Sequence, residues 1–198
     1  MRRAAAEPGA AQGAAPERAM ITGFAPIARP DARVLILGTV PSRRSLEADE
    51  YYAHPRNAFW PIVERLFARE TGLDYAARMS LLLEAKVALW DVLRAAERPG
   101  SLDARIVTSS AVANDFAGFF AGHRAVRTVF FNGTTARSLW ERHMAHTLLA
   151  GLDLRLVTLP STSRANAALT KEGKLAAWGA VRDAAAEDGS SETSPLTT

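Results

Sequence analysis

Short apolar runs alternate with longer amphipathic stretches through most of the chain. Four runs rich in Val, Ile, Leu and Phe, at residues 33–38, 86–90, 127–131 and 154–159, predict β-strands. Apolar residues at helical spacing predict helices over 59–67 and 79–83, and further helices are expected from about Ala111, Thr134 and Lys171. A long loop to about residue 57 follows the first strand. The strands lack polar alternation, so helices should cover both faces of a parallel sheet. The expected fold is a single-domain, three-layer α/β/α sandwich with a central four-stranded, mostly parallel sheet.

The two ends of the chain differ in composition from its middle. Residues 1–20 hold Ala, Gly, Pro and Arg without an apolar segment, which predicts a disordered leader, and Met20 is an alternative start of translation. Residues 187–198 are acidic and then rich in Ser and Thr, as in a solvated tail. The folded domain is therefore expected at 21–186. No apolar run approaches the roughly 20 residues that cross a bilayer, so no membrane partner is expected. We also expect a monomer with a cytoplasmic, nucleoid-associated location of the bacterial type.

Composition excludes several kinds of chemistry. The chain has no cysteine, which rules out disulfides, thiolate zinc sites, cysteine nucleophiles and cysteine-bound iron–sulfur clusters. Of the four histidines only His143 and His146 have helical spacing, and a solvated helix face explains them, so no metal or organic cofactor is expected. The net charge is only +3, but almost all basic residues are arginine. This bias suits nucleic-acid binding and equally suits a GC-rich genome.

Ligands of open parallel α/β sheets bind outside the carboxyl ends of the strands, which selects four loops. These loops begin at Gly38, Asp91, Asn132 and Pro160. The first, Gly-Thr-Val-Pro-Ser at 38–42, offers a tight turn, hydroxyls and backbone amides suited to a phosphate or a base edge, but it lacks the further glycines of a dinucleotide fingerprint. The last, Pro-Ser-Thr-Ser-Arg-Ala-Asn at 160–166, can bind a phosphodiester or simply cap the next helix.

The segment 51–60, Tyr-Tyr-Ala-His-Pro-Arg-Asn-Ala-Phe-Trp, combines aromatic and polar side chains. Aromatic rings stack on unpaired bases, and Arg or His contacts phosphate, so the segment could hold an extruded nucleotide. The alternative is that Phe59 and Trp60 are core residues and that Asn57 only caps the helix.

Taken together and in this order, the four loops resemble those of the uracil-DNA glycosylase superfamily. The segments 38–42 and 52–60 are most similar to its hypoxanthine-DNA glycosylase branch, and the segments 89–93, 100–103, 131–133 and 159–163 extend the resemblance over about residues 30–185. The resemblance implies a monofunctional enzyme that extrudes a deaminated base from DNA and hydrolyses its N-glycosidic bond, leaving an abasic strand. Because no lysine falls in the first loop, a Schiff-base lyase step is not expected.

The resemblance also implies roles for individual residues. Asn57 would orient the attacking water, Phe59 would stack on the base, and Asp91 and Asn132 would read its polar edge, although Asp91 could instead hold its loop in shape. Gly38 and Val40 would complete the base site. The DNA strand would be held by Pro41, Ser42, His54, Arg56, Ser161, Thr162, Ser163, Arg164 and Asn166.

Two positions depart from the pattern of the superfamily. Many members carry an acidic or amide residue before the first-loop proline, where this chain has Val40, and the hypoxanthine branch commonly has proline where this chain has Arg164. Two alternatives therefore stay open: a glycosylase for uracil or for thymine in mismatches, and a non-catalytic nucleic-acid-binding module. A small-molecule α/β hydrolase is disfavoured because the chain lacks a Gly-x-Ser-x-Gly elbow.

Overall fold

The computed structural model describes residues 20–68, 70–100, 102–144, 152–166 and 169–187. The four predicted strands form one parallel sheet in the order β3-β2-β6-β7. They are β2 (Val34–Gly38), β3 (Val87–Asp91), β6 (Thr128–Asn132) and β7 (Arg155–Leu159). The register pairs Gly38 with Asp91 and Asn132 with Leu159, so the carboxyl ends of the strands align at one edge.

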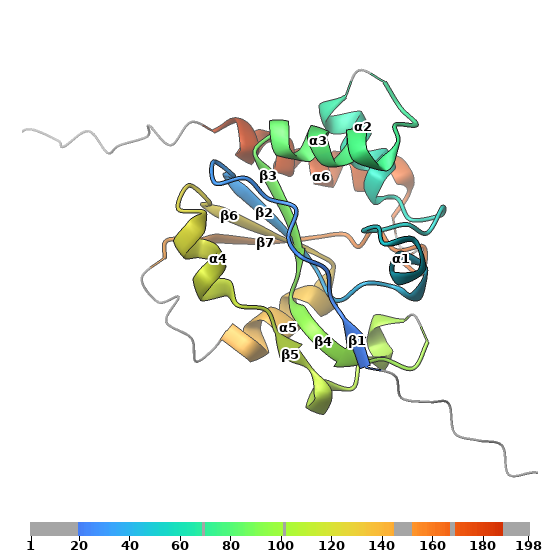
Figure 1. Ribbon diagram of the computed structural model, residues 1–198. Helices are drawn as coiled ribbons and strands as arrows, with labels where there is room; N and C mark the ends of the chain where they lie inside the picture. Colours follow the sequence, from blue (N-terminus) through green and yellow to red (C-terminus); the bar gives the residue numbers. More distant parts are fainter. Residues whose placement is uncertain (1–19, 69, 101, 145–151, 167–168, 188–198) are drawn as a thin grey trace, which may run out of the picture.

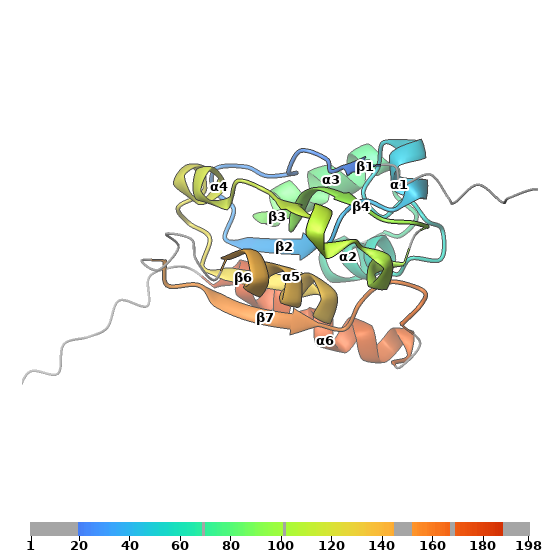
Figure 2. The same cartoon turned by 90° about the horizontal axis from the view of Figure 1, so that it is seen from below.

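Helices cover both faces of this sheet, which confirms the three-layer, single-domain prediction (Figures 1 and 2). One face packs against α2 (Phe59–Phe67), α3 (Tyr75–Glu84) and α6 (Lys171–Ala186). The other face packs against α4 (Phe116–Gly122) and α5 (Thr134–Met144). Alternate strand residues enter the two cores: Leu35 and Leu37 face α4 and α5, whereas Val34 and Ile36 face α2 and α6.

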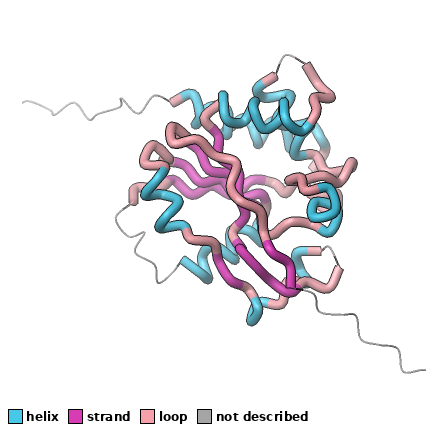
Figure 3. Tube along the Cα trace, in the orientation of Figure 1, coloured by secondary structure: helices cyan, strands magenta, loops and turns pink. Residues whose placement is uncertain are grey.

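A second, antiparallel sheet was not predicted. It consists of β1 (Met20–Thr22), β4 (Leu93–Glu97) and β5 (Val112–Ala113), in the order β1-β4-β5 (Figure 3). The 3₁₀ turns η1 (Asp103–Arg105) and η2 (Thr108–Ser110) connect β4 to β5. The strands of this sheet are too short for a clear alternation of apolar and polar residues, so the sequence pattern does not reveal them.

Two helices also differ from the prediction. The long loop after the first strand contains α1 (Arg43–Ala48), which Ser42 caps by accepting a hydrogen bond from the Ser45 amide. The predicted start of the helix near Ala111 is wrong. Helix α4 begins at Phe116, because Asp115 caps it by accepting a hydrogen bond from the Gly118 amide.

The predicted leader and tail lie mostly outside the described residues. Met20, assigned to the leader, is instead the first residue of β1 and pairs with Glu97. Glu187, assigned to the tail, is the C-cap residue of α6. Within the described ranges, no helix has the length and apolarity needed to span a membrane.

Candidate active site

The four loops singled out from the sequence line one cavity of about 720 Å³ at the carboxyl edge of the parallel sheet. Its wall combines the segment after β2, the end of β3, the start of α5 and the whole loop after β7. The η1 turn, which follows the unpredicted strand β4, closes a further side. A volume of this size is typical of a small-molecule site. The expectation that these loops share one crevice is therefore confirmed.

Gly38 has no side chain, and the space this leaves at the cavity wall is occupied by polar groups of two neighbouring residues. A Cβ atom on Gly38 would lie 2.4 Å from Oδ1 of Asp91 and 2.7 Å from the hydroxyl of Tyr52. Both distances are shorter than non-bonded contacts allow, so a side chain at this position would displace the two polar groups. The glycine therefore lets Asp91 and Tyr52 approach the same point.

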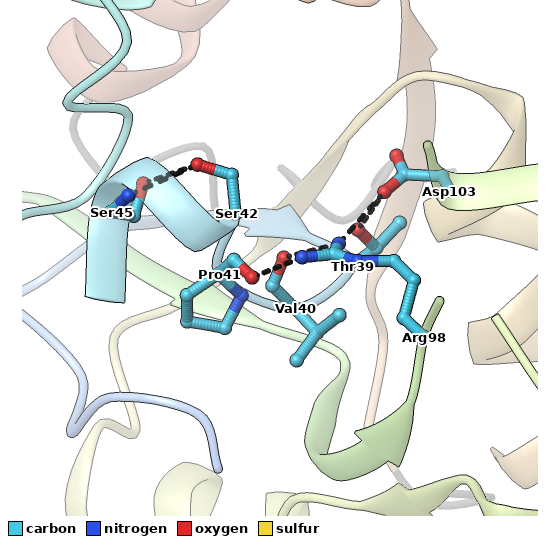
Figure 4. Close-up of polar contacts among 7 residues, drawn as sticks. All are labelled: Thr39, Val40, Pro41, Ser42, Ser45, Arg98 and Asp103. Atoms are coloured by element: carbon cyan, nitrogen blue, oxygen red, sulfur yellow. Dashed lines mark hydrogen bonds and ion pairs between the residues drawn. The ribbon is translucent and has the colours of Figure 1, made fainter. Parts of the chain in front are cut away.

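A buried arginine shapes the first loop (Figure 4). The guanidinium of Arg98 donates to the carbonyl oxygens of Val40, at 3.2 Å, and of Pro41. It also contacts Asp103 at 3.4 Å, and Asp103 accepts a hydrogen bond of 2.9 Å from the Thr39 hydroxyl. Residues 39–41 are thus held through their backbone rather than through apolar packing alone. No sequence signal predicts this role, because the sequence pattern does not distinguish a buried arginine from an exposed one.

Asn132 ties the loop after β6 to the loop after β7. Its amide nitrogen donates to the Thr162 hydroxyl, and its amide oxygen accepts from the Thr162 backbone N–H, both at 2.8 Å and both buried. Asn132 lines the cavity as predicted, yet its amide is already paired with protein on both sides. These hydrogen bonds hold the loop after β7 in place. The predicted contact of Asn132 with the base edge stays a prediction.

We expect Asn132→Ala to lower the free energy of unfolding by about 2 to 3 kcal/mol, because it leaves the buried amide and hydroxyl of Thr162 unpaired. Urea unfolding followed by circular dichroism measures the difference. Thr162→Ser is the matched control, since it keeps both groups that Asn132 contacts. An Asn132→Ala variant as stable as this control would contradict the role.

The loop after β7 is held by four further contacts. The Ala58 amide donates to the Thr162 carbonyl at 3.0 Å, and Trp178 of α6 donates through its indole to the Pro160 carbonyl, also at 3.0 Å. The ammonium of Lys174 donates to the Asn166 carbonyl at 2.7 Å and contacts the Ser163 carbonyl at 3.5 Å. These contacts hold the loop in place while its residues 160–166 line the cavity.

Asn57 lies on the cavity wall with the Gly38 and Pro160 loops. Its side-chain oxygen accepts a hydrogen bond of 3.0 Å from the amide of Phe59, the first residue of α2, whereas the N-cap position of the helix is Ala58. Asn57 therefore combines a contact at the start of α2 with a position on the cavity wall. The same bond orients the side chain, which would otherwise rotate freely.

Phe59 does not reach the cavity. Its side chain is fully buried, and the ring of Tyr52 stacks on it with centroids 4.1 Å apart. Tyr52 lines the cavity in its place, with a backbone φ of 54° that turns the chain sharply after Tyr51. A base bound in this cavity would meet Tyr52 before Phe59, which corrects the predicted position of Phe59 and agrees with its alternative as a core residue. Trp60 is likewise buried, at 3% exposure.

Asp91 is the buried carboxyl group of the site, with 4% of its surface exposed. Burial raises its pKa to about 7, with a further increase from Asp103 and an opposing decrease from Arg98. Its Oδ2 atom has no hydrogen-bond partner among the described residues. Asp91 thus lines the cavity with a carboxyl group that titrates near neutral pH.

The raised pKa of Asp91 makes folding less favourable as pH increases. Unfolded Asp91 loses its proton near pH 4, whereas the folded state holds it until about pH 7, so stability is lost across this window. We expect Asp91→Asn to raise the free energy of unfolding by roughly 2 to 4 kcal/mol at pH 8 and to change it little at pH 4. Chemical unfolding at the two pH values tests this. An equal effect at both would contradict the assigned pKa.

The predicted DNA contacts fall into two places. The cavity wall includes Pro41, Ser42, His54, Ser161, Thr162, Ser163, Arg164 and Asn166. Arg164 is exposed. Arg56 lies instead in an adjoining hollow of about 460 Å³, beside Arg65 and Lys171. Arg44 lines the main cavity but was not selected from the sequence. Among the described residues, no group of His, Asp or Glu could hold a metal ion, and His146 lies outside them.

Comparison with known proteins connects this cavity to a family. Residues 18–184 match the uracil DNA glycosylase superfamily. The chain is 31% identical to a hypoxanthine DNA glycosylase of Methanosarcina acetivorans over 160 residues, which cover 80% of this chain and 96% of the relative. It is also 34% identical to a hypoxanthine DNA glycosylase of Methanosarcina barkeri over 85 residues. These residues cover 42% of this chain and 54% of the relative.

A solved structure agrees with the fold. The solution structure of a Methanosarcina acetivorans protein assigned as a uracil DNA glycosylase superposes with a TM-score of 0.70 and 30% sequence identity. The superposition covers 84% of this chain and 99% of that protein. The chain belongs to the uracil DNA glycosylase superfamily.

Proposed function

We propose that this protein is a monofunctional DNA glycosylase that removes a deaminated base, above all hypoxanthine, and leaves an abasic site for base-excision repair. The observation that carries the proposal is the cavity of about 720 Å³, in which Asn57, Asp91 and the loop 160–166 meet. The two curated relatives named hypoxanthine DNA glycosylase support the choice of base. The partner is DNA, and the protein acts as a monomer in the cytoplasm.

The reaction requires the nucleotide to leave the stack. A base inside a duplex is inaccessible, so it must be extruded into the cavity, and a mismatched or damaged pair costs least to open. The exposed Arg164 and the serine-rich loop beside it stand at the cavity, where the flanking phosphates would lie. Backbone N–H groups and hydroxyls of that loop offer further donors to the strand.

Asn57 then positions the water that attacks the sugar. A neutral amide is not a strong base, so its contribution is orientation of the water against an oxocarbenium-like sugar. Its oxygen accepts from the Phe59 amide, so the NH₂ group is the part of the side chain left to donate to a water. Negative charge leaving on the base is stabilised by hydrogen-bond donors that surround it.

A lyase step is not expected, because Lys174, which holds the loop after β7, is engaged in hydrogen bonds. The Lys174 ammonium is bound to the carbonyl oxygens of Asn166 and Ser163, and Lys174 does not line the cavity. A Schiff base with the abasic sugar would require these contacts to break. The product is therefore an intact abasic strand.

The test uses labelled duplexes that carry one deoxyinosine, one deoxyuridine or one mismatched thymine, incubated with the purified protein. We expect strand cleavage at deoxyinosine only after alkali, which reveals an abasic site. Cleavage only at deoxyuridine would assign the enzyme to uracil, and cleavage without alkali would show a lyase. Binding without cleavage of any duplex would favour a non-catalytic module.

A further inference from the structure

Hydrolysis of an N-glycosidic bond requires the attacking water to lose a proton, and Asn57 cannot accept it. A neutral amide can orient the water, but it is not a base. The proton acceptor must therefore be another group in the same cavity. Among the described residues, the titratable side chains that line the cavity are Arg44, Tyr51, Tyr52, His54, Asp91, Arg98, Asp103 and Arg164.

Most of these side chains cannot accept a proton near neutral pH. The arginines and tyrosines hold their protons, and burial raises the pKa of both tyrosines further. Nδ1 of His54 accepts a hydrogen bond of 3.1 Å from the Arg56 amide, so the neutral ring carries its proton on Nε2 and presents a donor. Asp91 is only 4% exposed, and its Oδ2 atom is buried. Asp103 is the carboxylate that is left.

The Asp103 carboxylate is held through one oxygen and is open at the other. Its Oδ1 atom accepts from the Thr39 hydroxyl at 2.9 Å and from the Arg98 guanidinium at 3.4 Å. Within the described part of the chain, Oδ2 takes part in no hydrogen bond, and Figure 4 shows the second oxygen turned away from Thr39 and Arg98. The side chain is 38% exposed, whereas that of Arg98 is 1% exposed. Asp103 thus offers a free oxygen on a carboxylate of fixed orientation.

We infer that Asp103 is the general base of the reaction, its Oδ2 atom accepting a proton from the water that Asn57 orients; the inference rests on the proposed function. The water oxygen forms a bond to C1′ of the sugar, and the bond from C1′ to the base breaks with its electron pair leaving on the base. The base then takes a proton from solvent, and Asp103 returns its proton to solvent. No further reactant is needed.

The assigned role requires ionised Asp103, which gives the reaction a pH dependence. Arg98, Asp91 and Tyr52 are the charged or titratable groups that face it. Burial raises the pKa of Asp103 above its ordinary value, against the opposing effects of Thr39 and Arg98. A raised pKa makes a carboxylate a better proton acceptor, and the rate should fall as pH decreases through that pKa.

The experiment measures single-turnover excision from a deoxyinosine duplex between about pH 5 and pH 9 with saturating enzyme. Asp103→Asn keeps the shape of the side chain and an oxygen that can accept from Thr39 and Arg98, but it removes the proton acceptor. We expect this variant to be slower by about 10²- to 10⁴-fold at neutral pH, and to lose the fall in rate at low pH. DNA affinity, measured by fluorescence anisotropy, should change by less than about threefold, because the machinery for strand binding is intact.

Thr39→Val is the matched control, because it removes one hydrogen bond to Asp103 and leaves the carboxylate in place. We expect it to lower the rate by less than about tenfold and to keep the fall at low pH. Asp103→Glu, which retains a carboxylate, should also keep that fall. If Asp103 only holds the first loop, Asp103→Asn will lose no more rate than Thr39→Val and will keep the pH profile of the wild type, which would overturn the inference.

Asp91 also titrates in this range, so Asp91→Asn is measured in parallel. We expect the fall in rate at low pH to persist in Asp91→Asn, whatever its maximal rate, and loss of the fall in this variant would overturn the inference without any change at Asp103. Failure of the wild-type protein to excise any base would instead overturn the proposed function. Circular dichroism establishes that each variant is folded.

Discussion

Replacement of Asn57 by alanine should reduce the single-turnover rate on deoxyinosine duplexes by about 10²- to 10⁴-fold, with the affinity for the same DNA within a few-fold of wild type. The reason is that Asn57 lines the cavity with a neutral amide that is fixed in orientation by its bond to the Phe59 amide. Without this amide, no hydrogen bond from Asn57 orients the attacking water. Rapid-quench kinetics and fluorescence anisotropy measure rate and affinity separately.

Asn57→Ala also removes the hydrogen bond to the first residue of α2, which costs about 1 kcal/mol of stability and must be separated from catalysis. Asn57→Ser provides this separation, because a serine hydroxyl can accept from the Phe59 amide but lacks the NH₂ group. We expect Asn57→Ser to be as slow as Asn57→Ala while regaining most of the lost stability. A serine variant with nearly full activity would show that Asn57 only caps the helix.

The parts of the fold that were predictable are those in which local pattern and tertiary burial agree. The strands at 34–38, 87–91, 128–132 and 155–159 are apolar on both faces because helices cover both faces. Their carboxyl ends then must lie at one edge, which places the first loop, Asp91, Asn132 and Pro160 together. The small sheet was missed because β5 has only 2 residues and its pairing with β4 is set by contacts distant in sequence.

The site itself was only partly predictable, because the sequence shows which residue types are present but not which side chains point into the cavity. Phe59 and Tyr52 are both aromatic residues of one segment, and only the packing of Tyr52 on Phe59 decides which of them lines the cavity. Asp91 was identified by its place after a strand, whereas its unpaired oxygen and raised pKa depend on how deeply it is buried. The role of Arg98 could not be predicted from sequence, because its partners are backbone carbonyls of residues 40 and 41, which every residue type possesses.

Arg98→Met should lower the free energy of unfolding by about 3 to 5 kcal/mol, a large effect for one substitution. Methionine has similar length and fills the space, but it leaves the carbonyls of Val40 and Pro41 and the carboxylate of Asp103 without their donor. Urea unfolding at neutral pH measures the change. Arg105→Met is the matched control, because Arg105 is exposed in the same segment and its loss should change stability by less than about 0.5 kcal/mol.

The same variant connects stability to chemistry. Arg98 lowers the pKa of Asp91, so its removal should raise that pKa further and make ionisation of Asp91 more costly to the folded state. The loss of stability in Arg98→Met should therefore be larger at pH 8 than at pH 4, and Asp91→Asn in the same protein should reduce this difference. Equal losses at both pH values would mean that Arg98 acts only by holding residues 39–41. A pH-dependent loss would mean that this buried arginine both holds the first loop and favours the ionised form of Asp91.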